Sequence, residues 1–149
     1  MLYLNNAQRA MIWEFHNSFQ NLSGIPFAKY SCTYEWFMQG IIGLSTKIKS
    51  IPFSSLSSVV TDILNNDERQ IIYKDLEEFG SKCPVLYDIF HNNGTKALIF
   101  NAMYGNKNSI IGVLVMEYHS DIPDNLNFNE LKIDTAQITS ILNLRYKYN

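Results

Sequence analysis

The chain has 149 residues, of which 46% are hydrophobic and 17% charged, and its formal net charge is −2. This composition predicts a soluble globular protein, and the length predicts one domain over residues 1–149. Lysine and arginine are scattered rather than clustered, which argues against binding of a nucleic-acid duplex. No apolar run reaches the ~18 residues that span a bilayer, and the N-terminus does not resemble a signal peptide. We therefore expect no membrane partner and a cytoplasmic location (the host cytoplasm if the protein is viral).

Two strands are predicted near the start of the chain. In Arg9–Asn17 the bulky residues Met11, Trp13 and Phe15 alternate with Ala10, Ile12, Glu14 and His16. Phe27–Phe37 is rich in aromatic and β-branched residues and alternates in the same way. Its bulky face comprises Tyr30, Cys32, Tyr34 and Trp36, and its polar face comprises Lys29, Ser31, Thr33 and Glu35. We expect these strands to form a hairpin, with Met11 and Trp13 packed against helices at the ends of the chain.

The middle of the chain predicts two helices and a short strand. Apolar residues at helical spacing over Ser55–Leu64 indicate the first helix. Pro84 suits the first turn of the second helix, which runs to about Asn92. Between them we expect a strand at Arg69–Tyr73 and an acidic surface segment at Asp75–Gly80.

A hairpin and a long helix complete the predicted elements. Lys96–Tyr104 and Asn108–His119 flank a GNKN turn, and the apolar run at 110–116 is typical of a central strand covered on both faces. The last helix is predicted from Phe128 to about Tyr146. Its apolar surface is wider than one contact with a sheet requires. Either another segment of the chain covers it or it forms a dimer interface, and we expect a homodimer.

Three segments resemble the GAF domain, a relative of the PAS and profilin-like folds. KALIFNAMYGNKNSIIGVLVMEYHSD and NFNELKIDTAQITSILN resemble its last strands and closing helix, and EFHNSFQNLSGIPFAKYSCTYE resembles a GAF-like subgroup associated with bacteriophage genomes. The resemblance implies an α+β fold with an antiparallel five- or six-stranded sheet. With the strands numbered along the chain, their order across the sheet would be 2-1-5-4-3. Terminal helices would cover one face. Crossover helices would cover the other and enclose a pocket, which in relatives holds cyclic nucleotides, tetrapyrroles or small metabolites.

Polar residues near the end of the first strand suggest where a ligand binds. If Met11 and Trp13 face the terminal helices, the polar face of the hairpin points into the pocket. The predicted ligand-binding residues are Glu14, His16, Asn17, Ser31, Thr33, Glu35, Phe100 and Tyr104. Buried polar groups need hydrogen bonds, so the polar members either satisfy one another or bind the ligand. The two aromatic residues either stack on a planar ligand or belong to the core.

Neither a metal nor a cofactor is predicted. His16 and His119 are ordinary metal-ligand types, but if the first and last strands run antiparallel they lie at opposite ends of the sheet. Cys32 and Cys83 are expected to be free thiols, because two cysteines match neither a disulfide framework nor a zinc pattern.

Three functions follow from these expectations. The first is a non-catalytic module that senses or sequesters a small, nucleotide-like molecule. The alternative is a scaffold that dimerises through its last helix or docks on a virion or host protein. An enzyme comes third: the resemblance includes free methionine sulfoxide reductases, but nothing next to Cys83 would lower its pKa. The Asn-Lys motif of phosphodiesterase GAF domains is missing at the end of the last strand, where this chain has Glu117-Tyr118.

Overall fold

The computed structural model describes residues 6–20, 26–105 and 109–148. Their six strands are β1 (Arg9–Gln20), β2 (Pro26–Phe37), β3 (Ile51–Pro52), β4 (Gln70–Tyr73), β5 (Ala97–Tyr104) and β6 (Ile110–Tyr118). The helices are the 3-10 helix η1 (Phe53–Leu56), α2 (Ser57–Leu64), α3 (Leu76–Lys82), α4 (Pro84–Asn92) and α5 (Phe128–Tyr148). The strands form one antiparallel sheet in the order β3-β2-β1-β6-β5-β4. The α+β fold and the strand order are confirmed, with the two-residue β3 added beside β2.

The acidic segment Asp75–Gly80 is helical, which the prediction of a surface segment missed. Asp75 is the N-cap of α3, and its carboxylate accepts a hydrogen bond from the backbone N–H of Glu77 at 3.1 Å. Acidic residues in the first turn also suit the positive end of the helix dipole. Pro84 lies at the start of α4, as predicted.

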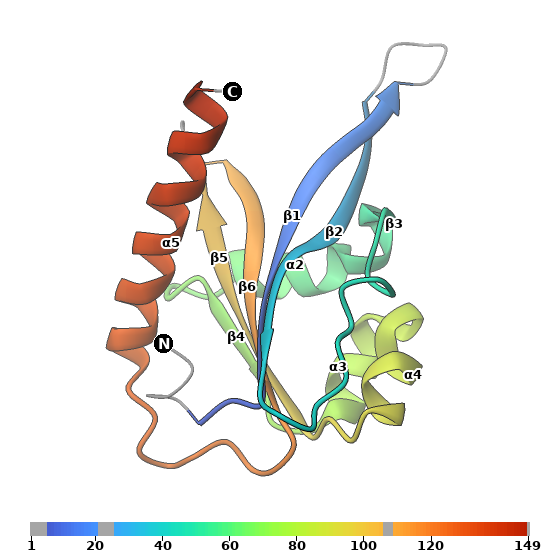
Figure 1. Ribbon diagram of the computed structural model, residues 1–149, viewed down its shortest axis with the longest axis vertical. Helices are drawn as coiled ribbons and strands as arrows, with labels where there is room; N and C mark the ends of the chain where they lie inside the picture. The colour runs from blue at the N-terminus through green and yellow to red at the C-terminus, as the bar shows by residue number, and fades with distance from the viewer. Residues whose placement is uncertain (1–5, 21–25, 106–108, 149) are drawn as a thin grey trace.

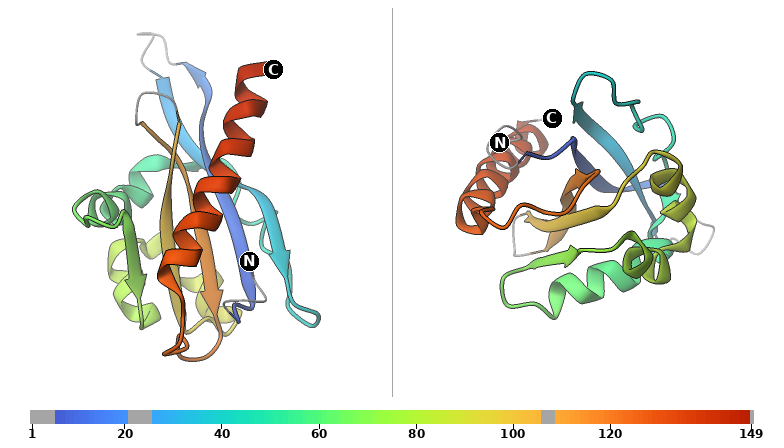
Figure 2. Two further views of the ribbon diagram at one scale, coloured as in Figure 1. Left: turned by 90° about the vertical axis from the view of Figure 1, so that its left-hand side faces the viewer. Right: turned by 90° about the horizontal axis from the view of Figure 1, so that it is seen from below.

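Helices cover both faces of the sheet (Figures 1 and 2). Helix α5 lies along one face, and η1, α2, α3 and α4 lie on the other. Under α2–α4, Trp13 lies at the centre of a cluster of rings, 5.7 Å from Tyr30, 6.2 Å from Phe90 and 5.5 Å from Phe100 between ring centroids. Phe79 stacks on Phe100 at 5.6 Å. Aromatic side chains therefore fill the space in which the sequence predicted a ligand pocket.

The predicted assignment of the two sheet faces is wrong. Met11 and Trp13 belong to the core under α2–α4, whereas the core against α5 contains Leu114, Met116 and Leu131. The sequence could not separate these alternatives, because both faces of β1 begin apolar and both layers are helical. The polar face of β1 accordingly lies on the α5 side of the sheet.

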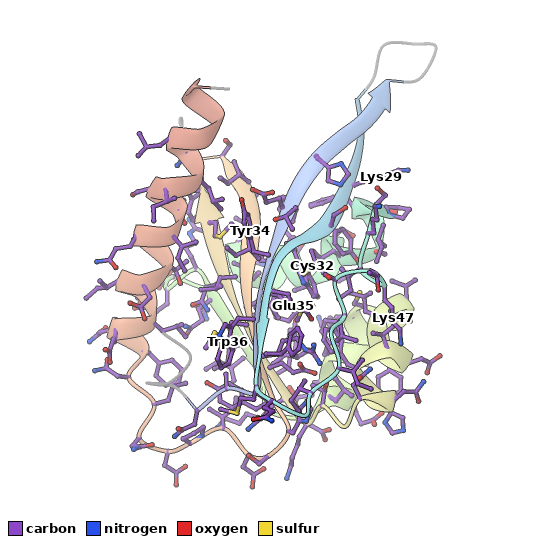
Figure 3. The ribbon with its side chains drawn as sticks, in the orientation of Figure 1. Lys29, Cys32, Tyr34, Glu35, Trp36 and Lys47 are labelled. Atoms are coloured by element: carbon purple, nitrogen blue, oxygen red, sulfur yellow. The ribbon has the colours of Figure 1, made fainter. Side chains whose placement is uncertain are left out.

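A β-bulge at Thr33 changes the alternation within β2. Ile12 pairs with Tyr34 while the next residue, Trp13, pairs with Cys32, so Thr33 has no partner in the register. Beyond the bulge, Tyr34 and Trp36 point to the α5 side and Glu35 points to the side of α2–α4 (Figure 3). The predicted bulky and polar faces of β2 are therefore correct up to Cys32 and exchanged after it.

Candidate functional site

The predicted site residues divide between the two faces of the sheet. His16 Nε2 and Ser31 Oγ form a 2.8 Å hydrogen bond, and Ser31 Oγ also accepts the backbone N–H of Ser50 at 2.7 Å. Glu14 is buried and pairs with Ser31 in the register. Three predicted residues thus lie together, on the face opposite α2–α4.

The other five do not join them. The side chain of Asn17 lies outside the described residues. Thr33 is exposed at the bulge, and its hydroxyl donates to the backbone oxygen of Ile12 at 3.5 Å. Glu35 lies on the opposite face, Phe100 belongs to the ring cluster and Tyr104 is half-buried near the end of β5.

Glu35 belongs to a buried ionic network that the sequence analysis missed. Arg9 Nη1 lies 2.7 Å from Glu35 Oε2 and donates to the backbone oxygen of Ile42 at 2.6 Å. Arg9 Nε donates to Glu117, which also accepts the hydroxyl of Thr95. These contacts join β1, β2 and β6 to the segment between β2 and β3. One guanidinium thus lies between two carboxylates, and Arg9 Nη2 has no partner among the described residues. Because Arg9 and Glu117 are fully buried and the Glu35 side chain is only 5% exposed, the network offers little open surface to a ligand.

Both thiols are poor nucleophiles in this fold. Burial raises the pKa of the Cys32 thiol from 9.0 to about 12, and nearby Glu35 contributes in the same direction. Burial also raises the pKa of Cys83, which lies at the junction of α3 and α4. Since the thiolate is the reacting species, a thiol relay is not supported.

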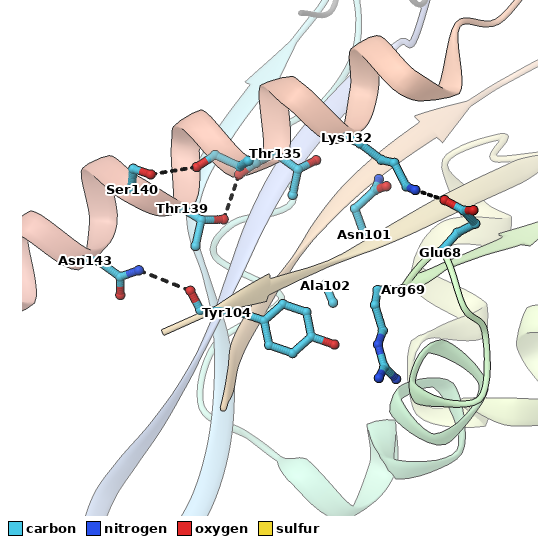
Figure 4. A pocket seen from close by; sticks show the side chains of 11 residues that line it. Glu68, Arg69, Asn101, Ala102, Tyr104, Lys132, Thr135, Thr139, Ser140 and Asn143 are labelled. Carbon is cyan, nitrogen blue, oxygen red and sulfur yellow. Dashed lines mark hydrogen bonds and ion pairs between the residues drawn. The ribbon is translucent and has the colours of Figure 1, made fainter. Parts of the chain in front are cut away.

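A polar groove lies between α5 and the edge of the sheet at β4 and β5 (Figure 4). Its volume is about 290 Å³. Strand β4 pairs with β5 only as far as Gln70 opposite Asn101, so Ala102–Tyr104 extend beyond the end of β4. The groove is lined by Glu68, Arg69, Asn101, Ala102, Tyr104, Lys132, Thr135, Ala136, Thr139, Ser140 and Asn143.

Asn101 gives the groove an unpaired hydrogen-bond donor. Its side-chain oxygen accepts from Gln70 Nε2 at 2.7 Å, but its Nδ2 has no partner among the described residues, and the residue is only 3% exposed. Leaving a buried donor unsatisfied costs about 1–3 kcal/mol. The Tyr104 hydroxyl is also buried and without a partner in the described part of the chain. A bound molecule with a hydrogen-bond acceptor would relieve the cost at Asn101.

Hydroxyl groups of α5 line the helical wall of the groove. The Thr135, Thr139 and Ser140 hydroxyls donate to the backbone oxygens four residues earlier, at 2.7, 2.6 and 3.0 Å. With their protons committed to the helix, these oxygens offer lone pairs to a ligand. Lys132 forms an ion pair with Glu68, and the Arg69 guanidinium donates to the backbone oxygen of Leu64.

A signal for this groove was present in the sequence. The residues of α5 that line it are Lys132, Thr135, Ala136, Thr139, Ser140 and Asn143, a small and polar stripe at spacings of three and four. Asn101 is the one polar residue in the strand ALIFNAMY apart from its terminal tyrosine. Buried polar residues of this kind need partners, and neither Asn101 nor the stripe was among the predicted site residues.

The described residues contain no group of three or more His, Cys, Asp or Glu side chains that could hold a metal ion. The antiparallel pairing of Arg9 with Glu117 and of Glu14 with Gly112 places the ends of β1 and β6 that carry His16 and His119 at opposite ends of the sheet. No helix within residues 6–20, 26–105 and 109–148 is long and apolar enough to cross a membrane.

No protein-family model matches the sequence, and no curated protein is similar to it in sequence. Solved structures do match. The PixJ GAF domain of Thermosynechococcus elongatus, in its blue-light-absorbing form, has a TM-score of 0.66 at 12% identity, covering 99% of this chain and 80% of that one. A domain assigned to a two-component sensor histidine kinase of Sinorhizobium meliloti 1021 has a TM-score of 0.62 at 15% identity, covering 99% and 87%. A red/green cyanobacteriochrome in its red-light-absorbing state has a TM-score of 0.66 at 12% identity, covering 99% and 90%. Likeness at this identity concerns the fold alone, and this chain has the fold of GAF domains.

Proposed function

We propose that the protein is a non-catalytic small-molecule-binding module, sensory or sequestering, and that its ligand lies in the groove between α5 and β5. The unpaired Nδ2 of buried Asn101 in this groove carries the proposal. The ring cluster supports it as well, because it fills the pocket predicted under α2–α4. The structural similarity to the sensory proteins named above also supports a binding role. A nucleotide-like ligand and a bacteriophage origin stay predictions.

The test is to block the groove without disturbing the core. Ala136 lines the groove from an exposed position on α5, so Ala136→Trp would fill the cavity while leaving buried side chains in place. Ser58→Trp, at an exposed position on α2, is the matched control. Native mass spectrometry of each protein purified from host lysate would measure the bound molecule. We expect it in the wild-type and Ser58→Trp proteins and not in Ala136→Trp.

A second variant separates the groove from the predicted site at the first strand. His16→Ala removes the hydrogen bond to Ser31 and leaves the groove intact. If His16→Ala abolishes binding and Ala136→Trp does not, the ligand lies at the predicted cluster of Glu14, His16 and Ser31 and the groove proposal is wrong. A protein free of any ligand from every lysate would also contradict it.

An interaction scaffold that forms a homodimer is the second candidate. On α5, the large apolar residues Ile133, Ile141 and Leu144 are exposed at helical spacing, on a side of the helix away from the groove. On the same face of the sheet, Tyr34 is 46% exposed and Trp36 is 38% exposed. Exposed apolar side chains gathered on one face are typical of protein interfaces.

Sedimentation velocity tests the homodimer. Ile141→Glu places a charge in the middle of the exposed stripe, and Val85→Glu does the same at an exposed apolar position on α4. We expect the wild-type and Val85→Glu proteins to sediment as dimers and Ile141→Glu as a monomer. If the wild-type protein is still monomeric at about 100 μM, the dissociation constant of any dimer is higher than that, which is weaker than most specific interfaces. That result would exclude this candidate.

A further inference from the structure

We propose that the groove between α5 and β5 recognises a small zwitterion, of which a free α-amino acid is the representative class. The inference rests on the proposed function and deepens it by naming the ligand chemistry. It follows from two kinds of hydrogen-bonding group that line the groove: donors at Asn101 and Lys132, and acceptor oxygens along α5 (Figure 4).

One part of the groove accommodates an anionic group. Asn101 Nδ2 is a buried donor without a partner among the described residues. Figure 4 shows Asn101 and Lys132 at the same end of the groove. Lys132 is paired with Glu68, but an ammonium group has three N–H donors and can bind a second acceptor. A carboxylate offers two acceptor oxygens, enough for Asn101 and Lys132 together.

The helical wall accommodates a group that donates hydrogen bonds. The hydroxyl protons of Thr135, Thr139 and Ser140 are committed to carbonyl oxygens of α5, so their oxygens act as acceptors toward the groove. Asn143 donates its Nδ2 to the Tyr104 backbone oxygen at 3.1 Å, which leaves its side-chain oxygen as a further acceptor. An ammonium group matches this row, because it has donors and no acceptor.

Charge and size agree with a zwitterion. The charged residues that line the groove are Glu68, Arg69 and Lys132, so the lining carries a formal charge of only +1. A ligand with several negative charges would lack matching cations there. A cavity of about 290 Å³ is at the lower end of the range for small-molecule pockets, which suits a molecule the size of an amino acid.

The probes are the twenty standard amino acids, tested by thermal shift and then by calorimetric titration of those that raise the melting temperature. The tightest binder is compared with the amine that lacks its carboxylate and with the acid that lacks its amino group. We expect each of these analogues to bind at least about tenfold more weakly, since each loses hydrogen bonds to a charged group.

Isosteric variants test the two ends of the groove in the same titration. Thr139→Val removes the acceptor oxygen while keeping the shape of the side chain. Thr61→Val is its matched control, because the exposed Thr61 hydroxyl makes the same bond along α2, to the Ser57 oxygen at 2.9 Å. Asn101→Asp replaces the donor by an acceptor. We expect Thr139→Val and Asn101→Asp to weaken binding about tenfold or more and Thr61→Val to leave it unchanged. Circular dichroism verifies that each variant folds, and Thr139→Val decides the outcome if Asn101→Asp does not fold.

The outcomes separate this inference from the proposed function. If a different molecule binds and Ala136→Trp blocks it, while no amino acid binds, the groove is a ligand site and the zwitterion is wrong. Equal binding of the analogue without the amino group also overturns the zwitterion. If Ala136→Trp changes the binding of no molecule, both the inference and the proposed function fail.

Discussion

Removing the Glu35 carboxylate should destabilise the fold far more than removing a surface carboxylate with the same ion-pair distance. In Glu35→Ala, buried Arg9 loses a partner at 2.7 Å, and the backbone N–H groups of Leu44 and Ser45 lose an acceptor at 2.6 and 3.1 Å. The Glu35 side chain is only 5% exposed, so water does not replace these contacts. Arg9 keeps Glu117 as a charge partner, so the cost comes mainly from the two backbone N–H groups left without an acceptor, at about 1–3 kcal/mol each. For a protein of this size, a total of about 2–6 kcal/mol lowers the melting temperature by about 4–24 °C.

Asp121→Ala is the matched control. Asp121 also lies 2.7 Å from its partner, Lys96, but its side chain is 84% exposed, and such a pair contributes less than about 1 kcal/mol. Urea unfolding followed by tryptophan fluorescence gives both free energies, with an unchanged slope against denaturant as the sign of two-state behaviour. If the two variants differ by less than about 1 kcal/mol, the contacts of Glu35 with Arg9, Leu44 and Ser45 do not stabilise the fold.

Two further predictions concern the interior. Burial raises the Cys32 pKa from 9.0 to about 12, so as the pH rises above 9 the unfolded chain loses this proton before the folded protein does. The free energy of unfolding should therefore fall above pH 9, and it should fall less in Cys32→Ala. Neither Cys32 nor Cys83 should react with a thiol reagent at pH 8 until denaturant is added, and rapid labelling of the native protein would contradict this. Gly112→Ala should destabilise by about 1–3 kcal/mol in urea unfolding, because the new methyl group would overlap the backbone oxygen of Trp13; a neutral effect would show that β1 and β6 can separate there.

Much of the fold could be predicted because local patterns and topology agree. Apolar periodicity located the helices at Ser55–Leu64, Pro84–Asn92 and from Phe128 onward, and the bounds in the structure differ from these by no more than two residues. The hairpin of β5 and β6 and the strand order followed from the turn and from the resemblance to GAF domains.

The candidate site could not be predicted to the same degree, because it depends on which side chains share a face. One additional residue at Thr33 reverses the alternation beyond it, so that Glu35 points to the side of α2–α4 and Trp36 to the side of α5. Strict alternation in the sequence does not reveal such a bulge. Arg9 was overlooked for a related reason: a charged residue at the start of a strand is usually exposed, and only the tertiary structure brings Glu35 and Glu117 to it.

Helix α5 takes part in both candidate interactions. One side of it lines the groove through Thr135 and Thr139, and another side exposes Ile133 and Ile141. A molecule in the groove and a second copy of the chain would therefore both contact α5. Linkage makes any such coupling reciprocal: a ligand that tightened self-association would itself be held more tightly by the dimer, and by the same factor. Titrating the ligand at protein concentrations above and below the dimerisation midpoint would measure that factor directly.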